Sequence, residues 1–274
     1  MKSRRHFLGK SLLIGAGLLT SRLWANTKHI SFGSSPLPEL RGKKVVFLYG
    51  GWEGHEPEKF RDYLVPWMKE EGASVEVFDT LEPYTNESLM KSVDLVVQIF
   101  TMSSITPEQE KGLLQAIKKG VGFAGWHGGM CDAFRNNPEY QFMTGGQWVS
   151  HPGGVIDYSV QIVDHTDNVT TGLKDFKMKS EQYYMHIDPN VKVLATTTFN
   201  NEHAFWIDGC TIPVAWKKMY GNGRVFFTSL GHNLDHITTV PEAIEILKRG
   251  IHWAGASKYL PKEEWIDAVY KPII

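Results

Sequence analysis

Histidines that follow predicted strands are the side chains best suited to chemistry in this sequence. His55 ends a glycine-rich stretch, residues 50–55 (GGWEGH), and His127 and His232 each come at the end of an apolar run. His151 lies in another glycine-rich loop, residues 150–154. Histidine exchanges protons near neutral pH and binds metal ions. A lone loop histidine is more often a capping or hydrogen-bonding group, but several at one sheet edge predict a functional cluster.

The residues around His127 are the most informative. Residues 125–129 read Gly-Trp-His-Gly-Gly, which has the G-x-Nu-x-G form of a nucleophile elbow. That turn predicts a side chain raised from the sheet and exposed to ligand. Because the raised residue is neither serine nor cysteine, acyl-enzyme chemistry at this point is excluded, whereas acid–base catalysis and metal binding are not. Cys131, four residues later, is interpreted as a packing residue.

The segments that carry these histidines predict strands alternating with helices. Apolar runs predict strands, and amphipathic spacing with a capping box and glycine stops predicts helices. The predicted strands are residues 45–49, 74–78, 95–100 and 121–126, and the predicted helices are residues 56–71 and 106–119. This order is typical of an α/β fold with a doubly wound, mostly parallel sheet. In such sheets ligands bind at the carboxyl ends of the strands.

The second half of the chain predicts an antiparallel extension of this sheet. Residues 158–163 alternate, residues 191–197 are β-branched, and residues 214–220 and 225–229 flank a turn typical of a hairpin. A closing helix is predicted over residues 241–253. We therefore expect one domain over residues 43–256, preceded by a leader at 26–42 and followed by a tail at 257–274.

The first 25 residues predict an export signal. They carry five cations and no acid, and an apolar run at residues 12–19 follows the charged part. The motif Ser3-Arg4-Arg5-His6-Phe7-Leu8 resembles a twin-arginine signal. A short amphipathic helix is the alternative. Because about 20 apolar residues are needed to cross a bilayer, no stable membrane span is expected after cleavage following Ala25. The predicted location is the periplasm or another exported site.

Composition excludes several classes of protein. The chain has 274 residues, 42% hydrophobic and 22% charged, which is typical of a globular protein. A formal net charge of −1 gives no electrostatic basis for binding nucleic acid. Two cysteines, Cys131 and Cys210, exclude a disulfide framework; an oxidising compartment permits them to pair, but nothing requires it. Nothing in the composition specifies an oligomeric state.

An ordered set of motifs over residues 43–256 resembles the ThuA-like (trehalose-utilisation) family. The motifs are the loop ending in His55, residues 122–129, Phe134, residues 138–140, 145–146 and 150–152, residues 181–184 (EQYY), residues 213–216 and 220–225, and Gly231-His232. The resemblance implies a flavodoxin-like fold of the class I glutamine amidotransferase-like type. In the related amidotransferases the elbow holds cysteine. Where the family pattern often has aspartate before the glutamate, this chain has Ser180.

The resemblance implies carbohydrate metabolism, commonly on glycosides oxidised at C3 of the sugar. A 3-keto group acidifies the proton on C2, so a base can abstract it, and the enolate can expel the C1 substituent or be reprotonated as an isomer. His127 would be the base, His232 or His151 the acid or enolate-stabilising donor, and Glu181 would orient an imidazole. The residues expected to contact the sugar are His55, Trp126, Gly128, Trp148, Tyr183 and Tyr184, although core packing explains the aromatic ones equally well.

Two alternatives remain open. A divalent metal such as zinc, held by His127, His151 and His232 with Glu181 as a further candidate, would polarise the ketone or a water molecule, as in a metal-dependent sugar hydrolase. Because these residues lie far apart in the sequence, they do not form a metal motif, and this version ranks below acid–base chemistry. In the second alternative the protein binds a small carbohydrate, or acts as a scaffold, without turnover.

Overall fold

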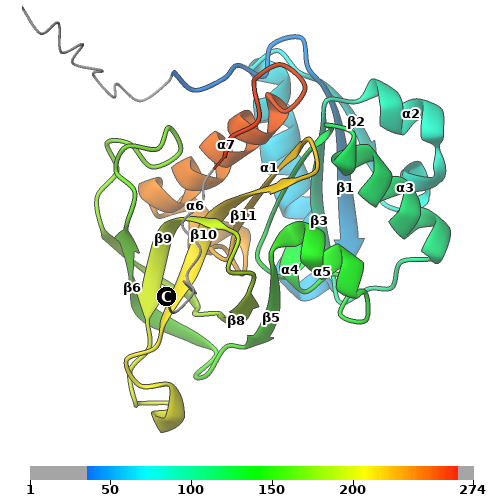
Figure 1. Cartoon of the computed structure of the whole chain (residues 1–274). Helices are drawn as coiled ribbons and strands as arrows, with labels where there is room; N and C mark the ends of the chain where they lie inside the picture. The colour runs from blue at the N-terminus through cyan, green and yellow to red at the C-terminus, as the bar shows by residue number, and fades with distance from the viewer. Residues whose placement is uncertain (1–35, 265–274) are drawn as a thin grey trace, which may run out of the picture. The chain divides into compact units, whose positions relative to one another are not determined.

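The computed structural model describes residues 36–264, whose centre is a nine-stranded sheet in the order β2-β1-β3-β4-β11-β10-β9-β6-β7 (Figure 1). Its strands are β1 (Lys44–Gly51), β2 (Ser74–Phe78), β3 (Leu95–Thr101), β4 (Gly122–Trp126), β6 (Val155–Ile162), β7 (Phe176–Glu181), β9 (Lys192–Thr198), β10 (Thr211–Tyr220) and β11 (Gly223–Thr228). A separate ribbon pairs β5 (Gly146–Ser150) with β8 (Tyr184–Ile187).

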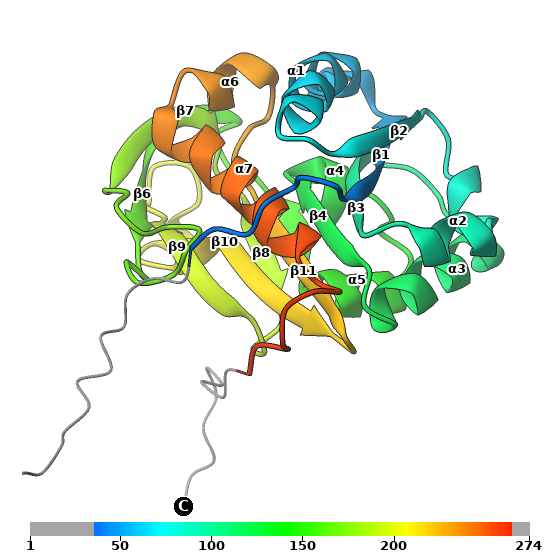
Figure 2. The ribbon, with the colours of Figure 1, turned by 90° about the horizontal axis from the view of Figure 1, so that it is seen from above.

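Helices cover both faces of the parallel half of the sheet, β2-β1-β3-β4-β11 (Figure 2). One face packs against α1 (Pro57–Glu70) and α7 (Pro241–Gly255). The other packs against α2 (Glu87–Ser92), α3 (Pro107–Lys118) and α5 (Pro138–Thr144). Because side chains alternate along a strand, Phe47 of β1 enters the first core and Leu48 the second. This confirms the predicted doubly wound, flavodoxin-like fold.

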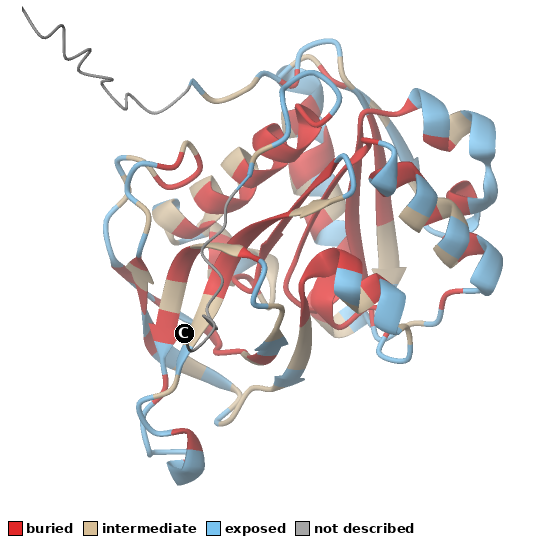
Figure 3. Cartoon of the chain, in the orientation of Figure 1, coloured by how far each residue is buried: buried red, intermediate tan, exposed pale blue. Residues whose placement is uncertain are grey.

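The antiparallel half of the sheet contains the predicted hairpin. β10 pairs with β11, and β9, β6 and β7 follow with every pairing antiparallel. Two reversals from β11 to β9 and two more to β7 leave β7 running in the same direction as β11. Its last residue, Glu181, therefore lies at the same sheet edge as the carboxyl ends of the parallel strands. Figure 3 shows that the central strands are buried, whereas the tip of the loop between β9 and β10 is exposed.

The segments flanking the domain contribute to its packing where they are described. Leu40, in the predicted leader, is fully buried. In the predicted tail, the Pro261 carbonyl accepts a hydrogen bond from Arg224 at 3.0 Å, and Glu263 accepts one from the Trp253 indole at 2.6 Å. Within residues 36–264, no helix is long and apolar enough to cross a membrane, and both cysteines are free. The predicted export signal, residues 1–25, lies outside the described residues.

Candidate metal centre and active site

His127 occupies a tight turn between β4 and the one-turn helix α4 (Gly128–Cys131). Its φ of 48° and ψ of −144° place a non-glycine residue at positive φ, which costs about 1–3 kcal/mol and persists only when the surroundings enforce it. Here its backbone N–H donates to the Thr228 carbonyl at 2.7 Å, and its Nδ1 lies 2.7 Å from the Ser229 carbonyl. The turn therefore fixes both the position and the orientation of the imidazole.

The expectation that His127 is exposed to ligand is wrong. Its side chain is 1% exposed, because the Tyr183 ring stacks on it at 4.1 Å between centroids and the rings of His55 and His232 lie at 4.6 and 5.6 Å. A ligand therefore approaches this histidine through its neighbours rather than directly from solvent.

His55 reaches the same place from the loop after β1. Its Nδ1 lies 2.8 Å from the Thr101 hydroxyl at the end of β3. Gly128 makes this approach possible, since a Cβ at that position would lie 2.4 Å from the His55 ring. Gly128, expected to contact substrate, thus packs against His55. Burial, and then repulsion by His127 and His232, lowers the pKa of His55 to about 2, so this imidazole is neutral.

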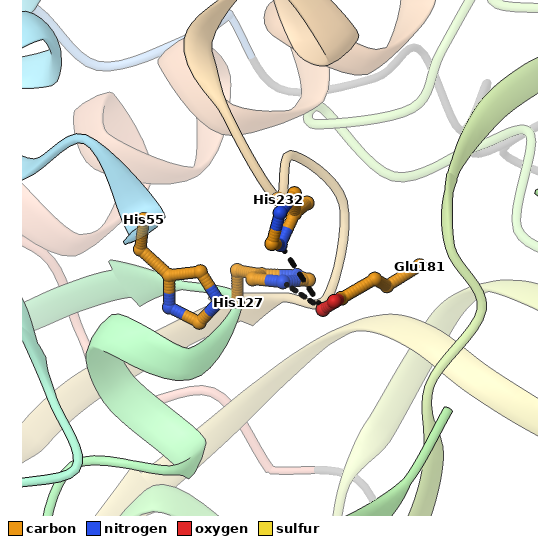
Figure 4. A group of neighbouring side chains, drawn as sticks. All are labelled: His55, His127, Glu181 and His232. Carbon is orange, nitrogen blue, oxygen red and sulfur yellow. Dashed lines mark hydrogen bonds and ion pairs between the residues drawn. The ribbon is translucent and has the colours of Figure 1, made fainter. Parts of the chain in front are cut away.

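Glu181 joins the histidines into one cluster (Figure 4). Its Oε2 lies 3.0 Å from Nε2 of His127 and 3.1 Å from Nδ1 of His232. Its other oxygen is 3.7 Å from Nε2 of His151. Burial alone would raise the pKa of Glu181, but its contacts with His127 and His232 lower it well below the usual range. Glu181 is therefore an anion in contact with several imidazoles.

The cluster has the composition and spacing of a metal site. One ligand atom from each of His55, His127, Glu181 and His232 can be chosen so that all lie within 4.8 Å of one another. Tetrahedral zinc ligands about 2.0–2.1 Å from the ion lie roughly 3.3 Å apart, so small side-chain rotations would bring this set to the metal. Of the residues predicted as metal candidates, His127 and His232 lie in this group with Glu181; His55 joins them, and His151 lies outside the group with its Nε2 3.7 Å from Glu181.

The donor and acceptor groups of the cluster are also consistent with a bound cation. The Ser229 carbonyl can only accept, so Nδ1 of His127 carries a hydrogen. In the neutral ring, Nε2 then presents a lone pair to the Glu181 carboxylate 3.0 Å away, which is also an acceptor. Two facing acceptors require a second proton on His127 or a cation between them. Burial lowers the pKa of His127, which disfavours the second proton.

His232 also places a ring nitrogen next to the Glu181 carboxylate. Its Nδ1 is buried and, among the described residues, makes no properly aligned hydrogen bond despite lying near Glu181. The backbone N–H of His232 is held by the hydroxyl of Ser180, the residue that stands where the family pattern often has aspartate. Ser180 therefore positions the His232 backbone.

The aromatic residues expected to contact sugar divide into two groups. Tyr183 stacks on His127, and Trp148 lies 5.6 Å from the His151 ring beneath the guanidinium of Arg135. By contrast, Trp126 is fully buried against Phe60 in the core under α1, and Tyr184 packs on Phe199. For Trp126 the expectation of a sugar platform is wrong, because the strand pleat directs it into the core. Tyr184 is partly buried against a separate small cluster beside the β5–β8 ribbon.

Three residues of the site were not anticipated from the sequence. Thr101 and Ser229 orient His55 and His127, and Trp52 lies beside the cluster with 44% of its surface exposed. A hydroxyl or carbonyl partner leaves no sequence signature, but a tryptophan among the glycines of residues 50–55 is a signal that could have identified Trp52.

Comparison with known proteins identifies the family. The sequence signature of ThuA, described as trehalose utilisation, matches residues 44–254, and the chain belongs to this family. Its carbohydrate-related role and its glutamine amidotransferase-like fold follow from that membership. No curated protein matches the chain in sequence.

Three solved structures share this fold. A putative ThuA-like protein from Bacteroides uniformis ATCC 8492 has a TM-score of 0.65 at 14% identity, covering 82% of this chain and 95% of that one. Another, from Parabacteroides merdae ATCC 43184, has a TM-score of 0.63 at 20% identity, covering 81% and 92%. A cytoplasmic protein from Salmonella typhimurium LT2 has a TM-score of 0.55 at 12% identity, covering 80% and 100%. At these identities the likeness concerns the fold alone.

Proposed function

We propose that this protein is a metal-dependent enzyme that acts on glycosides oxidised to a ketone at C3, with a divalent cation such as zinc held by His55, His127, Glu181 and His232. The observation that carries the proposal is the pair of facing acceptors, Nε2 of His127 and Oε2 of Glu181, 3.0 Å apart in a buried site. A cation held by these residues would satisfy both groups without a second proton on a buried imidazole.

The surrounding residues have separate roles in this proposal. Ser229 and Thr101 fix the ring orientations of His127 and His55, as outer partners of metal-binding histidines do. A divalent cation held by these residues would supply Lewis-acid polarisation of the ketone, which would acidify the neighbouring C–H. His151 is assigned as the base: its side chain is 34% exposed, and its Nδ1, although buried, has no hydrogen-bond partner among the described residues.

In the proposed elimination, His151 is the only proton carrier. His151 takes the proton from C2, and the electron pair left on C2 forms the C1–C2 double bond as the C1–O bond breaks. His151 then returns the proton to the departing oxygen, which gives an unsaturated keto-sugar and a free alcohol.

A polar groove is lined in part by Gln182, the residue after Glu181, and its size suits a substrate larger than one sugar ring. The groove has a volume of about 600 Å³ and is lined by residues that include Asp157, Gln182 and Asn200. Gln182 follows Glu181 directly, and His203, also in the lining, lies where a Cβ on Gly153 would contact it, in the loop that carries His151. We assign the leaving half of a disaccharide to this groove.

The second candidate is acid–base chemistry without a metal, with a protonated His127 paired to Glu181. The same 3.0 Å contact favours it, since a buried imidazole beside a carboxylate also resembles a catalytic dyad. In this version a proton occupies the place of the cation.

One experiment separates the candidates. The protein, purified without chelator, is analysed for bound metal and incubated with a 3-keto-disaccharide before and after removal of metal. Stoichiometric metal and turnover that disappears with the metal, and returns on adding it back, would support the proposal. Turnover that survives removal of metal would favour the acid–base candidate, and binding of the sugar without turnover would identify a sugar-binding protein.

Export is a further part of the proposal. Cleavage after Ala25 and passage through the twin-arginine route would deliver the domain folded, with its metal already bound. Cell fractionation of the full chain, compared with an Arg4→Lys and Arg5→Lys double variant, tests this. Unchanged location of the double variant would contradict it.

A further inference from the structure

Trp52 is an exposed aromatic residue next to the histidine cluster. Its ring lies 4.8 Å from the ring of His55 and 6.2 Å from that of His232, between centroids. It is nevertheless 44% exposed, although tryptophan is among the residues that gain most from burial. The exposed surface is therefore held at the site rather than packed in the core.

The backbone around Trp52 fixes this arrangement. Its N–H donates to the Thr101 carbonyl at 3.0 Å, and Thr101 also contacts His55 through its hydroxyl. Gly54 leaves room for the indole to lie across the loop, since a Cβ there would be 2.3 Å from the ring. The loop therefore presents the indole before any ligand binds, which lowers the entropy cost of recognition.

Trp52 also lies beside a histidine of the cluster that is partly exposed. The side chain of His127 is 1% exposed, whereas those of His232 and His151 are 15% and 34% exposed. Because Trp52 lies beside His232, one of the two accessible histidines, a ligand that reaches Glu181 past His232 meets the indole.

We infer that Trp52 is the platform on which the apolar face of the substrate's pyranose ring stacks while its polar edge faces the His55–His127–Glu181–His232 cluster. The identity of this ligand as a sugar rests on the proposed function. Pyranose rings carry one face of C–H groups and a rim of hydroxyls, so an indole beside polar groups matches both surfaces. A single aromatic ring beside imidazoles fits a small ring better than a protein surface, which needs a contiguous apolar patch.

The test compares three variants of the metal-loaded full chain: Trp52→Ala, Trp52→Phe and Trp206→Ala. Trp206 is the matched control, because it is 73% exposed but packs beside Phe205 on the β9–β10 loop rather than beside the histidines. Metal content and thermal unfolding are measured first. Steady-state turnover of a 3-keto-disaccharide and calorimetric binding of its unoxidised parent follow.

We expect Trp52→Ala to raise KM and the dissociation constant of the parent sugar roughly tenfold, the effect of losing the burial of one such apolar contact. The kcat should change less than threefold, and metal content should not change. Trp52→Phe should keep most of the affinity, and Trp206→Ala should match the wild type.

The outcomes separate this inference from the proposed function. Wild-type affinity in Trp52→Ala, or an equal loss in Trp206→Ala, would overturn the platform. Loss of metal in Trp52→Ala would also overturn it, because Trp52 would then support the cluster rather than the sugar. If the wild type binds the sugars without turning them over, the proposed function fails. The ratio of the dissociation constants of Trp52→Ala and the wild type still tests whether the sugar stacks on Trp52. If the wild type binds neither sugar, both fail.

Discussion

Replacing Glu181 with glutamine should have opposite effects on the metal-free and metal-bound protein. In the metal-free protein, Oε2 of Glu181 faces Nε2 of His127 at 3.0 Å and Nδ1 of His232 at 3.1 Å. The glutamine NH₂ group carries two hydrogens and can donate to both nitrogens. Glu181→Gln should therefore stabilise the metal-free fold while removing the anionic metal ligand.

The expected magnitudes follow from the same contacts. Each new hydrogen bond contributes about 1 kcal/mol, so unfolding of the metal-free variant should cost about 2 kcal/mol more than that of the wild type. At a free metal concentration 100 times the wild-type dissociation constant, binding stabilises the wild type by about 2.7 kcal/mol. If the variant binds 100-fold more weakly, it gains only about 0.4 kcal/mol at that concentration. The order of stability should thus reverse.

Thermal and urea unfolding at neutral pH, each with chelator and with added zinc, measure both effects. For a domain of this size, 1 kcal/mol corresponds to about 2–4 °C in Tm. The control is Glu76→Gln, which removes an exposed carboxylate on the edge strand β2 and should change neither state. Destabilisation of the metal-free Glu181→Gln protein by about 3–5 kcal/mol would refute the reasoning, because that is the cost of removing one partner of a buried ion pair.

Three further predictions concern other residues. His127→Ala should lower bound metal and reduce turnover by about 10²-fold or more, and it should also destabilise the fold, since His127 is buried; full metal occupancy in this variant would contradict its role as a ligand. Asp157→Ala should raise KM for a keto-disaccharide but not for a methyl keto-glycoside, and an equal rise for both would remove the groove from the binding site. Burial would raise the pKa of Asp164, but hydrogen bonds from Thr166 and Lys192 lower it to about 2, below its unfolded value near 4; its contribution is therefore present above pH 4 and lost as pH falls from about 4 to 2. Asp164→Asn should remove about 1 kcal/mol of that pH dependence, allowing for solvent screening at this half-buried site, and parallel acid-unfolding curves would contradict it.

The parallel half of the fold could be predicted because its signals are local. Continuous apolar runs mark β1, β3 and β4 as strands buried on both faces, and the capping box at Thr106 marks the start of α3. The strand β7 was not predicted, although Phe176 and Met178 alternate with exposed lysines. With only six residues and no turn signal beside it, its place in the sheet depends on pairing with β6, which is a long-range contact.

Whether residues face the site or the core was harder to predict, because a strand pattern does not say where the strand ends and the turn begins. Trp126 and His127 are neighbours in the chain, yet Trp126 follows the pleat into the core and His127 leaves it at positive φ. The gathering of His55, His127 and His232 could be expected from strand ends at one edge. That Glu181 approaches two of the imidazoles through one oxygen could not, since it depends on how β7 reaches that edge.

The conformation of the elbow would explain how a fold resembling that of the amidotransferases could carry the proposed metal site. At that turn a cysteine would present its sulfur to the substrate as a nucleophile. A histidine in the same conformation has two nitrogens, and the Ser229 carbonyl engages Nδ1. Only Nε2 remains, directed at Glu181, and Tyr183 covers the ring. A single lone pair, fixed by a strained backbone and screened from water, suits a metal ligand better than a group that must move to reach substrate. The accessible proton carrier then has to come from elsewhere, and His151, at the exposed side of Glu181, is placed for it.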